Sequence, residues 1–122
     1  MSTRTNLTTG IALSVAAACA LLSGCANTTK SVALYQWDGY QPQVYEYFKG
    51  QTSPLQQIDA LEKAREQILA KNASAPPGFH AHLGMLYASV GKDQQAKQEL
   101  LAEKQSFPES AIYMDFLLSK FQ

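Results

Sequence analysis

Apolar and polar residues follow a helical period over residues 53–72, and this segment predicts the longest helix of the chain. Ser53 suits the N-cap position and Pro54 the first helical position. The residues expected on the buried face are all apolar: Leu55, Ile58, Leu61, Ala64, Ile68 and Leu69. The charged run from Glu62 to Glu66 is expected on the opposite, solvated face.

A shorter helix is predicted before it, because Pro42 suits a first helical position and Gly50 a C-terminal cap. This part of the chain is rich in aromatic residues, namely Tyr35, Trp37, Tyr40, Tyr45, Tyr47 and Phe48. Such rings usually form the core of a small domain, and we favour that interpretation. Exposed rings would instead provide a stacking surface for a sugar or a peptide, and the sequence leaves this alternative open.

Residues 77–110 match the pattern of one tetratricopeptide unit, in which two antiparallel helices occupy about 34 residues. The matching positions are Leu83, Gly84, Tyr87, Gly91, Ala96, Leu100 and Pro108. The small side chains of Gly84 and Ala96 would let the helices cross closely, and Gly91 would form the turn between them. Asp93 is the expected N-cap of the second helix.

The chain is apolar again over residues 111–121, and this segment is expected to form a capping helix. Its predicted inner face consists of Ile112, Tyr113, Phe116, Leu117 and Phe121. Residues 34–122 therefore predict one all-α domain, a short tetratricopeptide-like right-handed stack of four to five helices. Residues 25–33 lack periodicity, which is typical of a flexible tether.

Residues 1–24 have the features of a bacterial lipoprotein signal peptide that is removed. Arg4 supplies the positive charge, Ile11 to Leu22 is apolar, and Leu22-Ser23-Gly24-Cys25 resembles the lipobox. The apolar run is too short for a membrane span, which needs about 20 residues. We therefore expect Cys25 to carry a diacylglycerol and an acyl chain such as palmitate, which together hold a protein on a membrane.

The residue after Cys25 indicates which of the two bacterial membranes holds the lipid-anchored protein. Asp at this position commonly retains lipoproteins in the inner membrane of enteric-type bacteria, whereas this chain has Ala26. We therefore expect a lipid-anchored protein of the outer membrane, on its periplasmic face.

The composition of residues 25–122 excludes several classes of function. They contain nine Lys or Arg and ten Asp or Glu, and this near-neutral balance argues against nucleic-acid binding. Cys25 is their only cysteine, so a disulfide or a thiol nucleophile is not expected.

His80 and His82 are the only histidines in the chain. Residues two apart on a helix point in nearly opposite directions, so these side chains are not expected to share a metal ion. His80 stands where the repeat usually has a large aromatic residue. It is expected to be a packed or capping side chain near Gly78.

Glu99 and Glu103 lie four residues apart on the predicted second helix, and Glu103 stands where the repeat usually has Ala. The neighbouring Lys97 and Lys104 favour a solvated face over a catalytic carboxylate pair. The sequence also lacks a glycine-rich phosphate loop, a G-x-S-x-G elbow and an HExxH helix. We therefore expect no enzymatic activity, no cofactor and no metal.

Three stretches carry a resemblance to a known family. They are Leu34-Tyr35-x-Trp37 with Tyr40 and Tyr45, Pro76-Pro77-Gly78-x-His80-Ala81-His82-Leu83-Gly84-x-Leu86-Tyr87, and Glu103-Lys104-x-x-Phe107-Pro108-Glu109-Ser110. Together they resemble small proteobacterial outer-membrane lipoproteins catalogued as a domain of unknown function, of the 4810 type. Members are typically encoded beside two lipoproteins, one similar to the curli secretion channel subunit and one similar to a peptidoglycan-binding protein. The resemblance implies a shared envelope complex and supplies no catalytic residues.

Two non-enzymatic functions follow as hypotheses. The first is an adaptor or assembly factor whose helical groove binds another envelope lipoprotein, such as a curli-channel-like one. The second is a structural lipoprotein that contacts peptidoglycan through its aromatic residues. The candidates for a partner-binding or packing surface are Tyr35, Trp37, Tyr40, Tyr45, His80 and Tyr87.

Overall fold

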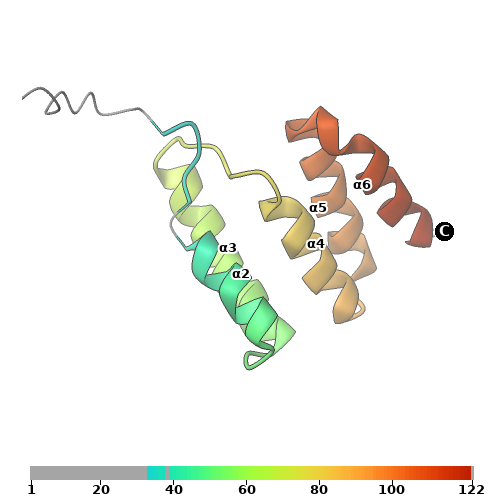
Figure 1. The fold of residues 1–122 in the computed structure, drawn as a ribbon, viewed down its shortest axis with the longest axis horizontal. Helices are drawn as coiled ribbons and strands as arrows, with labels where there is room; N and C mark the ends of the chain where they lie inside the picture. Colours follow the sequence, from blue (N-terminus) through green and yellow to red (C-terminus); the bar gives the residue numbers. More distant parts are fainter. Residues whose placement is uncertain (1–32, 38, 122) are drawn as a thin grey trace, which may run out of the picture. The chain divides into compact units, whose positions relative to one another are not determined.

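The computed structural model describes residues 33–37 and 39–121, and every regular element within them is helical (Figure 1). The helices are α2 (Tyr40–Lys49), α3 (Pro54–Ala70), α4 (Phe79–Ser89), α5 (Asp93–Ser106) and α6 (Ala111–Leu118), with the short 3-10 helices η1 (Pro108–Ser110) and η2 (Ser119–Phe121) on either side of α6. The predicted all-α class is confirmed. The predicted signal peptide, the lipid site at Cys25 and the tether up to residue 32 lie outside the described residues.

Successive helices lie beside one another (Figure 1). The closest packing joins α4 to α5, and further contacts join α2 to α3, α3 to α4 and α5 to α6. None of the described helices is both long enough and apolar enough to cross a membrane.

α2 begins two residues earlier than the sequence indicates. Its first residue is Tyr40, and Pro42 is its third. Pro42 is tolerated there because amide groups in the first turn of a helix have no intrahelical partner to lose. Gly50 ends the helix as predicted, with a left-handed backbone (φ 63°) and its N–H donating to the carbonyl of Glu46 at 3.1 Å.

α3 begins with the predicted Ser53 cap. The Gln56 N–H donates to Ser53 Oγ at 3.3 Å, and the Ser53 N–H donates to Gln56 Oε1 at 3.0 Å, so the two residues form a capping box. Most of the predicted inner face is buried, but Leu55 and Leu69 are exposed, which contradicts the prediction. Ile68, next to Leu69, is buried, so the two exposed leucines lie to one side of the buried face of α3.

The predicted close crossing of α4 and α5 is confirmed. A Cβ atom on Gly84 would lie 3.1 Å from Leu100 Cγ and 3.2 Å from the carbonyl oxygen of Ala96, so only glycine fits without displacement. The turn between the helices contains Gly91 with φ 74°. The predicted cap at Asp93 is wrong by one residue, since Lys92 is the N-cap and Asp93 opens the helix.

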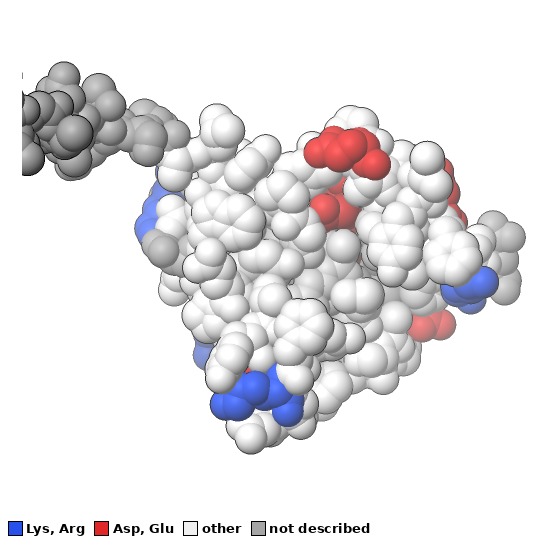
Figure 2. Space-filling model, in the orientation of Figure 1, with Lys and Arg blue, Asp and Glu red and all other residues white. Residues whose placement is uncertain are grey.

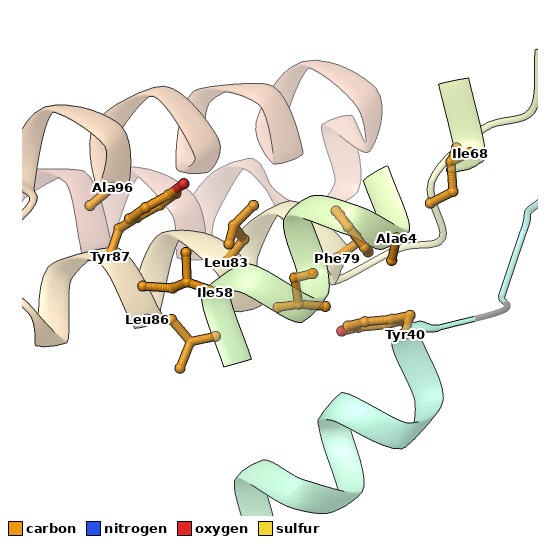
Figure 3. Packing of buried hydrophobic residues seen from close by; sticks show 10 residues of the cluster. Tyr40, Ile58, Ala64, Ile68, Phe79, Leu83, Leu86, Tyr87 and Ala96 are labelled. Atoms are coloured by element: carbon orange, nitrogen blue, oxygen red, sulfur yellow. The ribbon is translucent and has the colours of Figure 1, made fainter. Parts of the chain in front are cut away.

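The core lies mainly between α3 and α4 (Figure 3). It contains Tyr40, Ile58, Leu61, Ala64, Ile68, Phe79, Leu83, Leu86, Tyr87 and Ala96. Phe79 is completely buried and its ring centre lies 5.4 Å from that of Tyr40. The repeat pattern places its large aromatic residue at the position of His80. In this chain Phe79, one residue earlier, supplies the large aromatic side chain of the core.

α6 covers the end of the helical stack with a different face from the one predicted. Met114 is its buried residue, whereas Ile112, Tyr113 and Phe116 are exposed. Because α6 is apolar on almost all sides, the spacing of its apolar residues could not indicate which side faces α5. Most of the residues that were predicted to face the stack are therefore exposed to solvent.

Candidate functional site

A cavity of about 250 Å³ opens between α2 and α4. Its lining comes from one side of each helix and is mostly apolar: Tyr40, Val44, Tyr47, Phe48, Gly78, Ala81, His82 and Met85. Phe48 is 80% exposed, so a large apolar ring stands at the edge of this cavity in contact with water. Exposed apolar surface beside a cavity is typical of a binding site.

A second apolar cavity of about 200 Å³ lies between α4, α5 and the C-terminal helices. It is lined by Gly84, Met85, Ala88, Leu100, Leu117, Lys120 and Phe121. Met85 lines both cavities, so they lie next to each other along α4, and we call the surface that carries them the α4 groove. Figure 2 shows that most of the face over α2 and α4 is uncharged, with charged side chains mainly near its edges.

His82 provides a buried polar group in the α4 groove. Its side chain is only 5% exposed, and its Nε2 atom has no hydrogen-bond partner. The Tyr47 ring packs edge-to-face with the imidazole, with ring centres 5.0 Å apart. Burial lowers the pKa of the imidazole from its ordinary value of 6.5, so the ring is neutral at pH 7.

The aromatic residues before α3 divide between core and surface. Tyr40 is buried, and the partly buried Tyr35 packs edge-to-face with Phe107, with ring centres 5.8 Å apart. Trp37 is 42% exposed and stacks on Tyr40, whereas Tyr45 is 65% exposed. The segment therefore contributes rings to both the core and the surface, and neither Trp37 nor Tyr45 lines the α4 groove.

His80 and Tyr87 belong to a polar cluster that joins α3, α4 and α5. Glu99 lies at its centre, 2.7 Å from His80 Nδ1 through one oxygen and 2.7 Å from Arg65 Nη1 through the other. Arg65 also pairs with Glu62, whose other oxygen accepts the Tyr87 hydroxyl at 2.5 Å. Burial and the bond to Glu62 raise the pKa of Tyr87 to about 12.

This cluster corrects the prediction that the charged residues of α3 are purely solvated. Glu62 and Arg65 are only partly exposed, and each bonds to a residue of another helix. Lys63 and Glu66 on the same helix are exposed, as predicted. The charged run therefore has one side that faces water and one that ties α3 to α4 and α5.

Glu103 corrects the second prediction of a solvated acidic face, since Glu99 and Glu103 are both buried. Glu103 accepts hydrogen bonds from the Gly78 N–H at 2.7 Å and from the Ala81 N–H at 3.3 Å. Gly78 is the N-cap of α4 and has no side chain to satisfy these amides, so a carboxylate from α5 caps α4 instead. Together with burial, Glu103 raises the pKa of Tyr40 to about 12.

The carboxylates of the cluster are occupied by protein groups that hold the helices together. Over the described part of the chain, the structure places no three His, Cys, Asp or Glu side chains where they could hold a metal ion. Of the predicted candidates, only Tyr40 lines the α4 groove; His80 and Tyr87 stabilise the stack, and Trp37 and Tyr45 are exposed elsewhere. Sequence reasoning missed Met85 and Phe48 as groove residues because their apolar side chains fit a core equally well.

A family model described as Domain of unknown function (DUF4810) matches residues 34–117, which include both the α4 groove and the polar cluster. The chain belongs to the DUF4810 family. Searches of curated proteins and of solved structures found no match. The DUF4810 family resemblance noted in the sequence is thereby confirmed, and the function has to be inferred from the site.

Proposed function

We propose that this DUF4810 protein is a lipid-anchored adaptor of the bacterial envelope that binds another protein through its α4 groove. The observation that carries the proposal is the apolar groove itself, which joins two cavities at Met85 and has Phe48 exposed at its edge. Apolar grooves between helices commonly receive an apolar or amphipathic segment of a partner. No catalytic role is proposed for the polar cluster.

The repeat pattern of residues 77–110 supports the same function. In a tetratricopeptide-like stack, α4 and α5 would form one unit, and α2 and α6 would be the first helices of the units before and after it. Short helical repeats bind partners on an extended concave surface. The two cavities lie along α4, between α2 on one side and α6 on the other, as such a surface requires.

The partner we propose is another envelope lipoprotein. A lipid on Cys25 and an extended tether of residues 25–33 would keep the domain within about 30 Å of the membrane surface. A lipoprotein similar to the curli secretion channel subunit is the first candidate, because the family resemblance implies it. The outer membrane is the proposed location, since Ala26 follows the cysteine.

Photo-crosslinking in cells tests the adaptor proposal directly. A photoreactive amino acid would replace Met85 in the groove, and the control would carry it at Gln67, which is exposed on α3. We expect one specific envelope protein to be captured from position 85 and not from position 67. The Cys25→Ala form should capture less of it. Equal capture from both positions, or no capture, would contradict the proposal.

Contact with peptidoglycan is a second candidate function, supported by the exposure of Trp37 and Tyr45. Sugar rings stack on exposed aromatic side chains. Trp37 is the only tryptophan of the chain, so its fluorescence reports directly on this surface. A change in Trp37 emission on adding muropeptides, reduced in a Tyr45→Ala variant that keeps Trp37, would favour this function over the adaptor.

A further inference from the structure

The outer side of α6 is apolar, at the end of the described row of helices (Figure 1). Met114 is buried against the stack, and Ile112 and Phe116, two residues before and after it, lie on the opposite side of the helix. Ile112 is 90% exposed, and Tyr113 and Phe116 are each more than half exposed. We call these three exposed residues the α6 outer face.

An apolar surface is unusual at the end of a helical stack. The terminal helix of a repeat protein normally presents polar side chains to water, because these keep the protein soluble. Exposed apolar patches commonly mark sites of protein association. None of the three residues lines either cavity of the α4 groove, so the α6 outer face is a separate surface from the one proposed for the adaptor.

The charges at the two ends of this face make it complementary to itself. Exposed Glu109 precedes α6 in η1, and exposed Lys120 follows it in η2. Suppose that a second copy packs antiparallel to the first, about a two-fold axis that passes between Met114 and Asp115. Glu109 is as far before this point as Lys120 is after it, so each Glu109 lies opposite the Lys120 of the other copy. Two pairs of opposite charge then enclose the apolar residues.

The residues at the centre agree with the same arrangement. Tyr113 and Phe116 are equally far from the axis, so each ring lies opposite the other kind of ring in the second copy. On their own helix the two rings stack, with centres 6.3 Å apart and planes 18° apart, and so offer a flat apolar surface. Asp115, next to the axis, would approach its counterpart, but its charge is balanced by Lys104 at 2.6 Å.

The area of the face sets the strength of such an association. With about 200 Å² for a large aromatic side chain and about 100 Å² for isoleucine, the three residues expose roughly 300 Å² on each copy. Two copies would bury roughly 600 Å² of apolar surface, and the charged ends bring the total close to the 1,000 Å² or so of a specific interface. A weak, reversible dimer is therefore expected.

We propose that the α6 outer face is a self-association surface, through which two copies of this chain pair with their α6 helices antiparallel. The α4 groove of each copy stays outside this contact. The inference therefore goes beyond the proposed adaptor function and does not depend on it.

Photo-crosslinking between two copies tests the proposal on the full-length protein in cells. Two forms of the chain with different affinity tags are produced together, and one carries a photoreactive phenylalanine analogue in place of Ile112. The control carries the analogue at Gln67, which is exposed on α3. We expect the second tagged copy to be captured from position 112 at least about fivefold more efficiently than from position 67.

Charge reversal tests the antiparallel arrangement, with the analogue kept at position 112. Glu109→Lys in both copies places like charges opposite each other at both ends, and so does Lys120→Glu in both copies. Each should lower capture about fivefold. Combining a Glu109→Lys copy with a Lys120→Glu copy restores both pairs of opposite charge, so capture should recover. Both substituted residues are exposed, so the fold should be unaffected.

The other outcomes would overturn the proposal. Equal capture of the second copy from positions 112 and 67 would contradict self-association, and capture of a different protein from position 112 would assign the face to that protein. Capture that the single charge reversals leave unchanged, or that the mixed pair fails to restore, would refute the antiparallel pairing. None of these results bears on capture from position 85, which tests the adaptor separately.

Discussion

Glu103→Ala should be among the most damaging single substitutions in this protein, although the repeat pattern normally has alanine at that position. The Glu103 carboxylate is 3% exposed and accepts hydrogen bonds from the first amides of α4, those of Gly78 and Ala81. Alanine cannot reach either amide. The substitution would leave both without their acceptor and create a small cavity beside them.

The magnitude follows from these contacts. Hydrogen bonds to a charged group contribute about 1.5–3 kcal/mol each, and the bond to Ala81, at 3.3 Å, belongs at the low end. Water can reach part of the freed helix terminus because Gly78 is partly exposed, which reduces the loss. We expect Glu103→Ala to lower the free energy of unfolding by about 3 kcal/mol, a large share of the roughly 5–15 kcal/mol of a typical domain.

Urea unfolding followed by circular dichroism measures this loss. Glu103→Gln keeps one acceptor oxygen for the Gly78 amide but loses the charge, so it should cost about 1 kcal/mol. Glu66→Ala on the exposed side of α3 is the matched control and should change stability by less than about 0.5 kcal/mol. If Glu103→Ala were no more destabilising than Glu66→Ala, the capping role of Glu103 would be refuted.

Three further predictions concern packing, pH and anchoring. Gly84→Leu should lower stability by about 1–3 kcal/mol through overpacking against Leu100, and an unchanged urea midpoint would argue against the close crossing. Tyr40 and Tyr87 have a pKa of about 12 in the folded state and about 10 when unfolded, so their contribution to stability should be constant below pH 10 and be lost between pH 10 and 12. Urea midpoints across this range should fall less steeply for Tyr87→Phe; an equal slope would contradict its assignment. Cys25→Ala should release a folded domain into the aqueous phase of a detergent partition, and its retention in the detergent phase would refute the lipid anchor.

Local signals in the sequence predicted the parts of the fold that depend on local geometry. Ser53 caps α3, Gly50 ends α2 and Gly91 forms the turn after α4. Few residue types suit such positions: an N-cap favours a short polar side chain, and a left-handed backbone favours glycine. The crossing at Gly84 was predictable for the same reason, since any larger side chain would collide with α5.

The buried carboxylates could not be predicted in this way. Glu99 and Glu103 are flanked by lysines, and their partners lie 19 to 34 residues away along the chain. The exposed face of α6 was missed for a different reason, because a helix with apolar residues on almost every side has no periodic signal to orient it. The groove could not be predicted for both reasons. Its residues come from helices distant in sequence, and which apolar side chains stay exposed depends on how those helices are oriented.

The order in which the helices pack has a consequence for how this domain folds and opens. Its main helix contacts join neighbours in sequence, from α2 through to α6, so most contacts close short loops. Chains of this kind fold rapidly, because little loop entropy is lost before contacts form. They also lose structure from their ends, as a row of coupled units does. Hydrogen exchange should therefore be slowest at the α4–α5 pair and faster towards α2 and α6, the two helices that complete the groove on either side of α4.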